Sequence, residues 1–280
     1  MNYNFNNTLI DFHLHSFFSA DSDESPENIC KNAIDKGLSG ICFTDHIDFD
    51  MVNEDNSRLF LFDPDEYFNT LLKLKELFKG SLDINIGVET GLEPDKRDRL
   101  NDFVNNHPFD FVIGSSHLIN GIDPYYPKYF EGKTKKEALD EYFLSIITNL
   151  NTLSNFDVYG HLDYIIRYLP ESMVDSGTKR YSVIDYIDYI DEILKKLINS
   201  GKGIEVNTCG YRAGLNNPNP DFDIIKRYKE LGGEIITIGS DAHNAKDVGF
   251  MIKETKDILK KLGVNYITYF NNRKAEFMKI

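Results

Sequence analysis

The sequence predicts an α/β protein folded as one TIM-like (β/α) barrel. Short apolar runs alternate seven or eight times with longer amphipathic segments, which is the pattern of strands that are each followed by a helix. No proline-rich linker, low-complexity tract or change of composition divides the 280 residues, so we expect a single domain over residues 1–280. With 41% hydrophobic residues, the chain can bury a sizeable core.

Eight apolar runs are the candidate strands. Their length is typical of strands that are buried in a sheet. In chain order they are TLIDFH near residue 8, GICFT near 40, DINIGVE near 83, FDFVIGS near 109, DVYGH near 157, GIEVNT near 203, EIITIGS near 234 and VNYITY near 264.

Helix boundaries are marked between these runs. The dipeptide SP at 25–26 supplies an N-cap and a first helical position, and this helix is expected to end at Gly37. The dipeptide DP at 63–64 opens a second such helix, which ends at Gly80. Residues 181–200 predict a helix that faces the core, because apolar residues recur at helical spacing and so lie on one side of it. That side comprises Val183, Ile184, Ile187, Ile190, Ile193, Leu194 and Leu197.

Composition excludes several classes of protein. The formal net charge of -14 argues against a surface that neutralises nucleic-acid phosphates. The three cysteines, Cys30, Cys42 and Cys209, have no metal-type spacing and favour neither a disulfide framework nor a cysteine zinc site. The N-terminus lacks a signal-peptide pattern, and no run reaches membrane-spanning length. We expect a cytoplasmic protein without a membrane or nucleic-acid partner, and the sequence leaves its oligomeric state open.

Metal-type side chains follow six of the apolar runs. In a barrel the working face lies at the carboxyl ends of the strands, where these residues would meet. His13 and His15 are one residue apart at the end of the first run, so in a strand they project to the same side and could bind one ion. The full set is His13, His15, Asp45, His46, Glu89, His117, His161, Asp241 and His243.

Taken singly, each of these residues has an ordinary explanation. A histidine at a strand end is more often a partly buried group than a ligand. Glu89 alone would usually be a solvated carboxylate, and Asp241 could be a helix cap. Independent accidents would nevertheless scatter histidines over helices and loops, and of seven only His107 falls outside the pattern. We interpret His107 as a loop or helix-end residue with no catalytic role, and the others as one site.

This combination of imidazoles and carboxylates suits zinc, manganese or iron. No single ion can use so many ligands, so we expect two to three divalent ions. Two metals about 3.5–4 Å apart can hold a hydroxide between them and clamp the oxygens of a phosphoryl group. Glu89 is the natural bridge, because each of its carboxylate oxygens can serve one ion.

Six motifs in order resemble the polymerase-and-histidinol-phosphatase (PHP) family of metal-dependent phosphoesterases. They are DFHLHS, FTDH, GVETG, GSSH, YGHLD and IGSDAH, between residues 11 and 243. The stretches GSSHLINGIDPYYPKYFEGKTKKEALDEYF and IEVNTCGYRAG are similar to the histidinol-phosphate phosphatases within that family. The resemblance implies a distorted (β/α)7 barrel with a trinuclear centre. It also implies hydrolysis of L-histidinol phosphate to L-histidinol and phosphate, a step of histidine biosynthesis.

The resemblance further implies which residues hold each ion. The first ion would be held by His13, His15, Glu89 and Asp241, the second by Glu89, His117 and His161, and the third by His46, His243 and Asp21. Many family members have a histidine where this chain has Asp21, eight residues after His13. A carboxylate is a harder ligand, which shifts the expected third metal toward manganese or iron. Asp23 is an alternative to Asp21.

Catalytic and substrate-binding residues are expected around these ions. Asp241 is placed to orient the nucleophile while it ligates, and Glu89 and His243 complete the expected catalytic set. A phosphate should also meet arginines, whose planar fork suits bidentate contact. Arg167 and Arg212 follow the fifth and sixth runs and are the candidates.

Four further residues are candidates for substrate contact. The long, turn-rich stretch 119–133 is expected to be an active-site loop. The cationic end of histidinol phosphate calls for an acid or an aromatic rim. The additional candidates are Ser116, Asp163, Tyr125 and Tyr126. The donor that protonates the leaving alkoxide is not evident from the sequence.

Other functions are weighed against this one. A PHP exonuclease or polymerase-associated domain would act on nucleic acid, which conflicts with the net charge of -14. A non-hydrolytic metal-binding or phosphate-sensing protein is a further alternative. An amidohydrolase would also begin with HLH but commonly needs a metal-bridging lysine after a middle strand, and VIGSSH offers none.

Overall fold

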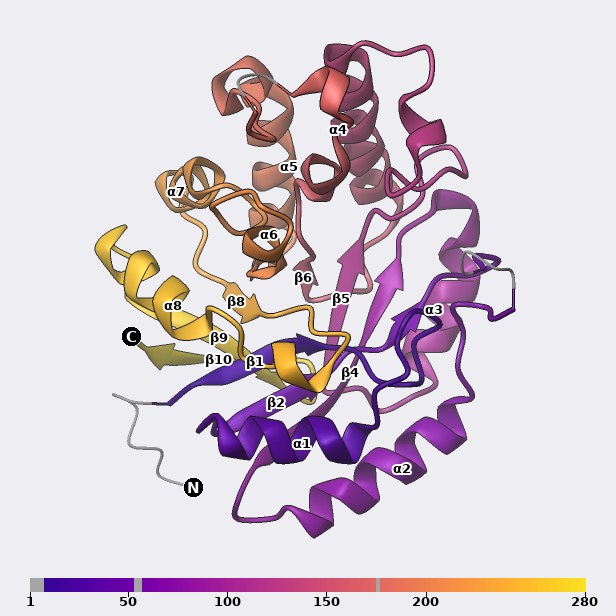
Figure 1. Ribbon diagram of the computed structural model, residues 1–280, viewed down its shortest axis with the longest axis vertical. Helices are drawn as coiled ribbons and strands as arrows, with labels where there is room; N and C mark the ends of the chain where they lie inside the picture. Colours follow the sequence, from indigo (N-terminus) through magenta and orange to yellow (C-terminus); the bar gives the residue numbers. More distant parts are fainter. Residues whose placement is uncertain (1–7, 53–56, 175–176) are drawn as a thin grey trace.

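Seven parallel strands form a nearly closed barrel in the computed structural model, which describes residues 8–52, 57–174 and 177–280 (Figure 1). The ring closes between its first and last strands: the amide of His15 donates to the carbonyl of Ala242 (2.9 Å), and that of Asp241 to the carbonyl of His13 (2.8 Å). The predicted seven-stranded α/β barrel is therefore confirmed. Its strands are β1 (Ile10–Leu14), β2 (Gly40–Phe43), β4 (Asp83–Gly91), β5 (Phe111–Ser115), β6 (Val158–Tyr159), β7 (Gly203–Asn207) and β8 (Ile236–Gly239).

Two short additions modify the ring. The two-residue strand β3 (His46–Ile47) pairs with the carboxyl end of β4. The eighth apolar run does not join the barrel: β9 (Tyr266–Asn271) pairs antiparallel with β10 (Lys274–Lys279). The hairpin packs at the amino ends of the strands, where the Phe270 ring stacks on Phe111 with centroids 5.0 Å apart. Its turn can be tight because Asn272 and Arg273 adopt left-handed backbone conformations.

Helices lie outside the barrel (Figure 1) and begin where the sequence marks them. The Ser25 hydroxyl accepts from the amide of Asn28 at the start of α1, and the Asp63 carboxylate caps α2. Both helices end two or three residues before the predicted glycines, which follow in left-handed conformations. The helices are α1 (Pro26–Asp35), α2 (Pro64–Leu77), α3 (Arg97–Asn105), α4 (Lys135–Thr152), α5 (Ile187–Asn199), α6 (Cys209–Arg212), α7 (Phe222–Glu230) and α8 (Ile252–Lys261).

The helix expected over 181–200 is shorter than predicted. Residues Val183–Tyr186 form a 3-10 turn, and the α-helix starts at Ile187. The tighter turn changes the angle between successive side chains, so the apolar stripe does not continue through it. Ile184 is 71% exposed as a result, whereas Ile190, Ile193, Leu194 and Leu197 are buried as predicted. None of the described helices is both long and apolar enough to cross a membrane.

Candidate metal centre

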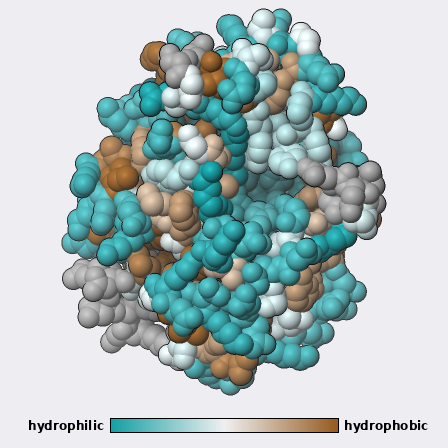
Figure 2. Space-filling model, viewed as in Figure 1, coloured by the Kyte–Doolittle hydropathy of each residue, from teal (hydrophilic) through white to brown (hydrophobic). Residues whose placement is uncertain are grey.

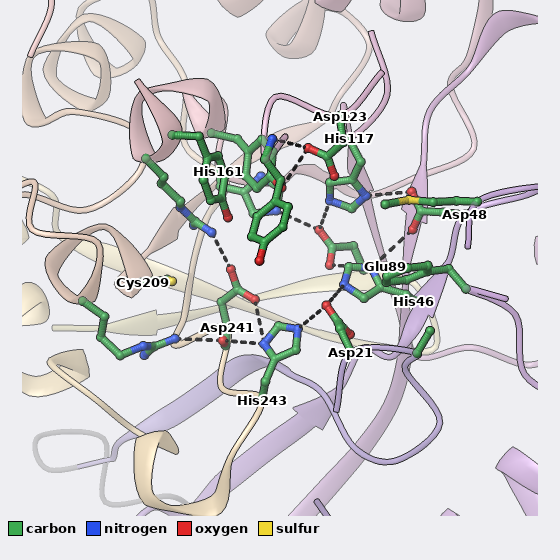
Figure 3. Close-up of a pocket in the computed structure, with 18 of the residues that line it drawn as sticks. Asp21, His46, Asp48, Glu89, His117, Asp123, His161, Cys209, Asp241 and His243 are labelled. Atoms are coloured by element: carbon green, nitrogen blue, oxygen red, sulfur yellow. Dashed lines mark hydrogen bonds and ion pairs between the residues drawn. The ribbon is translucent and has the colours of Figure 1, made fainter. Parts of the chain in front are cut away.

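A pocket of about 650 Å³ opens at the carboxyl ends of the barrel strands. Figure 2 shows this face hollowed near its middle, with mostly hydrophilic residues around the hollow. Seven of the predicted ligands line the pocket, and Figure 3 shows their side chains converging on it: Asp21, His46, Glu89, His117, His161, Asp241 and His243. His13 and His15 lie beneath them and are fully buried.

The strands explain this convergence. His13 lies in β1 and Glu89 in β4, while His117 and His161 each follow a strand by two residues. Parallel strands in a barrel present all their carboxyl ends to one face, so residues far apart in the chain meet there. Asp241, after β8, adopts a left-handed backbone with φ of 55°. Such strain in a non-glycine residue is typical of a functional site.

The Nε2 atoms of His13 and His15 point at each other. Nδ1 of His13 lies 2.5 Å from Glu205 Oε1, which can only accept, so this nitrogen carries the proton. The Ser19 hydroxyl donates to Asp45 and accepts from Nδ1 of His15 (3.0 Å). When each ring carries this single proton, both Nε2 atoms keep their lone pairs, although they are only 2.9 Å apart. A cation bound between the two Nε2 atoms removes the repulsion between their lone pairs.

Glu89 faces two groups of rings, one with each oxygen. Its Oε2 lies 3.0 Å from Nε2 of His13 and 3.4 Å from Nε2 of His15. Its Oε1 lies 2.9 Å from Nε2 of His161 and 3.2 Å from Nε2 of His117. This arrangement is what a carboxylate bridging two ions requires.

A third group brings Asp21 together with His46 and His243. The Asp21 carboxylate lies 3.1 Å from Nε2 of His243 and 3.7 Å from Nε2 of His46. Asp23, the alternative, has a fully exposed carboxylate that pairs with Arg58 instead. The geometry thus favours Asp21 over Asp23.

The donor set fits divalent cations. Burial and the neighbouring imidazoles of His243 and His46 lower the pKa of His15 well below its usual value, so its ring stays neutral. Burial opposes charge on His13, yet the carboxylates of Glu205 and Glu89 raise its pKa well above the usual value. These carboxylates therefore favour a positive charge beside them. Either a metal ion or a proton can supply that charge. In the part of the chain that the structure describes, Nδ1 of buried His161 has no hydrogen-bond partner.

Two acids that were not among the predicted site residues orient the predicted ligands. Glu205 holds His13 as described, and its other oxygen accepts from the amide of His161 (2.9 Å). Asp48 accepts from Nδ1 of His117 (2.7 Å). Such partners set the tautomer and angle of a ligating histidine. Both acids carried a visible signal: Glu205 interrupts the apolar run GIEVNT, and Asp48 follows His46 at strand spacing.

Both predicted arginines line the pocket beside Asp241. Arg167 is buried, and its Nη1 donates to Asp241 Oδ2 (2.9 Å) while its Nε donates to Asn219 (2.7 Å). Nη2 of Arg212 donates to the carbonyls of Ser240 (2.7 Å) and Asp241 (2.8 Å). One terminal nitrogen of each guanidinium is buried without a hydrogen-bond partner among the described residues. These two nitrogens are donors that no group of the described residues uses.

Two predicted substrate contacts lie outside the pocket lining. The Ser116 hydroxyl is buried against Tyr159 (2.5 Å) and the amide of Asn149 (2.7 Å). The Asp163 carboxylate accepts from Asn219 (2.6 Å) and from the amide of Asp221 (3.0 Å). These side chains support the walls of the pocket, because their polar atoms are hydrogen-bonded within the protein, and their contact with substrate stays a prediction.

The loop 119–133 does line the pocket, as expected, through Asp123, Tyr125 and Tyr126. Asp123, which was not among the predicted site residues, accepts from the amide of Tyr125 (2.8 Å) and the hydroxyl of Tyr164 (3.2 Å). Figure 3 shows it beside His117, on the opposite side from His243. His107 lies elsewhere, with Nδ1 donating to the carbonyl of Phe103 (2.7 Å), as a helix-end residue would.

Comparison with known proteins gives the class of this barrel. The family model of the PHP domain matches residues 11–209, so the chain belongs to the PHP domain family. The histidinol-phosphatase of Lactococcus lactis is 34% identical over 271 residues, which are 95% of this chain and 96% of that protein. The probable histidinol-phosphatase of Clostridium acetobutylicum is 32% identical over 96% of this chain and 99% of its own length.

A solved structure extends the similarity to the fold. The crystal structure of histidinol phosphate phosphatase from Lactococcus lactis, complexed with zinc, L-histidinol and phosphate, superposes with a TM-score of 0.86 at 34% identity. The match covers 96% of this chain and 99% of that one. Asp241 and His243 lie beyond the part matched by the family model, and here the barrel itself brings them to the site.

Proposed function

We propose that this protein is a histidinol-phosphatase, which hydrolyses L-histidinol phosphate to L-histidinol and phosphate. The observation that carries the proposal is the full-length similarity to an enzyme whose structure holds zinc, L-histidinol and phosphate. The pocket of this chain supports it independently, because it combines a cluster of metal-type ligands with two arginines that have nitrogens available to an anion. The activity is that of a metal-dependent phosphoric monoester hydrolase.

We assign the ligands of two to three divalent ions to the three groups described above. Zinc is the metal in the relative's structure, and manganese or iron suits the group containing the Asp21 carboxylate. When bound, such ions lower the pKa of coordinated water and neutralise charge on phosphoryl oxygens. Glu89 would be shared between two ions, and Glu205 and Asp48 would hold the rings of His13 and His117 that bind them.

The protein's own residues orient the reacting groups. Arg167 and Arg212 bind the phosphoryl oxygens through their unpaired guanidinium nitrogens. These contacts become stronger as negative charge develops on the phosphoryl oxygens in the transition state. Asp241 orients the attacking water, and its carboxylate is kept in place by Arg167 and by the Asn207 side chain (3.2 Å). His243 lies beside this carboxylate, with Nδ1 3.6 Å from Asp241 Oδ1.

The cationic end of the substrate is assigned to Asp123. This carboxylate is buried in the pocket wall, and burial raises its pKa to about 6. Tyr164 and Tyr168 lie beside it with ring centroids 4.9 Å apart, and Tyr125 contacts Tyr168 at 5.2 Å. An acid next to a row of aromatic rings suits an amine and an imidazole. Asp123 thus replaces Asp163 as the acid of the substrate site.

Asp123→Asn is expected to raise the KM for histidinol phosphate ~10-fold or more, since a hydrogen bond to a charged group contributes about 1.5–3 kcal/mol. The amide keeps the acceptor that Tyr125 and Tyr164 use, so the fold should be unaffected. Inhibition by inorganic phosphate and hydrolysis of an aryl phosphate that carries no cationic group should not change. An equal loss on the aryl phosphate would show that Asp123 does not recognise the cation. Asp95→Asn, on the surface, is the matched control.

Side-by-side assays of histidinol phosphate, a nucleoside monophosphate and single-stranded DNA test the function. Histidinol phosphate should give the highest kcat/KM. A preference for DNA ends would favour the exonuclease alternative and overturn the proposal.

Removal of the metals should abolish the activity. Purified protein is expected to carry two to three transition ions per chain, and activity lost to a chelator should return with zinc, manganese or iron. Metal content by inductively coupled plasma spectrometry, measured alongside turnover, checks both statements. Activity that survives chelation, or that depends on magnesium alone, would contradict the imidazole-rich site.

A further inference from the structure

Arg58 and Phe60 follow β3 and contact the surroundings of the third ligand group. The backbone returns toward the barrel here: the amide of Asp48 donates to the carbonyl of Phe60 (2.9 Å), and the amide of Phe60 to that of Met51 (3.1 Å). The Phe60 ring meets the His46 ring edge to face, with centroids 5.4 Å apart. This segment therefore covers one side of a predicted ligand.

The Arg58 guanidinium binds the turn that carries Asp21. Nη2 donates to the carbonyls of Phe17 and Ser19, the latter at 2.8 Å. Nη1 donates to the carbonyl of Ser22 (3.1 Å). The three acceptors lie on both sides of Asp21 in the chain, so one planar group ties together the whole turn.

This turn has little regular structure to hold it. Within it, the amide of Ser19 donates to the carbonyl of Ser16 (2.9 Å), and that of Ser22 to the carbonyl of Ser19 (3.3 Å). The Ser22 hydroxyl also donates to the carbonyl of His243 (3.0 Å). The amide of Phe17 donates to the carbonyl of Glu24 (2.8 Å), and the amide and hydroxyl of Ser19 donate to Asp45. His46 lies in a strand, whereas Asp21 lies in a turn without strand or helix pairing and is positioned by such contacts.

We propose that Arg58 is a positioning residue for the third ion, because it holds the 17–22 turn with the Asp21 carboxylate toward His46 and His243. The inference rests on the metal centre of the proposed function. A guanidinium can donate to several carbonyls at once in a fixed plane, which a lysine ammonium on a flexible stem does not reproduce. Without it, the turn must be ordered each time an ion binds, and the affinity of this site alone decreases.

Zinc binding to the whole protein tests the inference without any substrate. Wild type, Arg58→Ala and Arg58→Lys are stripped of metal and titrated with zinc against a chromophoric chelator. Wild type should bind three ions. Arg58→Ala should retain two with unchanged affinity and bind the third ~10–100-fold more weakly, and Arg58→Lys should lie between them. Asp21→Asn should reproduce the loss, and Arg97→Ala, an exposed arginine of α3, should not.

The zinc titrations can either support or overturn the role of Arg58. Weakening confined to one ion supports the inference, and the two retained ions show that the variant is folded. Three sites of wild-type affinity in Arg58→Ala, equal weakening of all the sites, or a wild type that binds only two ions would each overturn it. Failure of the wild type to hydrolyse histidinol phosphate would instead refute the proposed function, because zinc binding does not depend on that substrate.

Discussion

Glu89→Gln is expected to lower kcat for histidinol phosphate by roughly 1000-fold, with loss of at least one bound ion. The amide has the shape of the carboxylate but not its charge. Burial alone would raise the pKa of Glu89, yet the positive charge of His13, His46 and His117 holds it well below its usual value. Loss of one electrostatic contact in an active site raises the barrier by up to about 4 kcal/mol, which corresponds to this change in rate.

Metal content and turnover, measured on the same sample, check this prediction. Glu76→Gln is a suitable control, since that side chain is exposed on α2. The Glu89 hydrogen bond from the Ser115 hydroxyl (2.6 Å) can be kept by the glutamine oxygen, so a folded variant is expected. A variant with near-normal activity and full metal content would show that Glu89 is not the bridging ligand.

Arg212→Ala should reduce kcat/KM for histidinol phosphate by at least ~100-fold, because charge-assisted contacts to a buried phosphate contribute a few kcal/mol and strengthen in the transition state. In so acidic a chain, long-range electrostatics repel an anionic substrate, and local cations must provide the attraction. The affinity for inorganic phosphate should fall with kcat/KM, while metal content stays unchanged.

The contacts of Arg212 make a second variant useful. Its Nη2 supports the backbone carbonyl of Asp241, so the alanine also removes a brace next to a predicted ligand. Arg212→Lys keeps the positive charge but not the planar guanidinium, and its kcat/KM for histidinol phosphate should fall about 10-fold. Arg97→Ala is the surface control. Wild-type efficiency of Arg212→Ala on histidinol phosphate would refute the role in phosphate binding.

Local signals in the sequence were enough for most of the architecture. Alternating apolar runs predicted the barrel strands, and the SP and DP dipeptides predicted the starts of two helices, because caps and periodicity depend on neighbouring residues only. The apolar run near residue 264 could not be distinguished from a barrel strand by such local signals. A strand in a hairpin and a strand in a barrel have similar local composition, and the choice depends on which surface remains to be covered.

Placement at strand ends also explains why the sequence could indicate which candidate ligands lie together, and why it could not indicate where the candidate substrate contacts point. All carboxyl ends of a parallel barrel meet at one face, so His117 and His161 could be assigned to it from position alone. Position does not determine where a side chain points once the strand has ended. Ser116 and Asp163 follow strands just as closely, yet both turn into the protein and bond there.

The sequence by itself determined the elements, the face that carries the site and the residue types gathered there. Only the tertiary structure decided how those residues are held. Glu205 contacts His13 across 192 positions, and Arg58 reaches Ser19 across 39. Such partners are set by the angles at which strands and loops meet in space. A linear sequence does not encode those angles at any fixed spacing, because they result from the packing of the whole barrel.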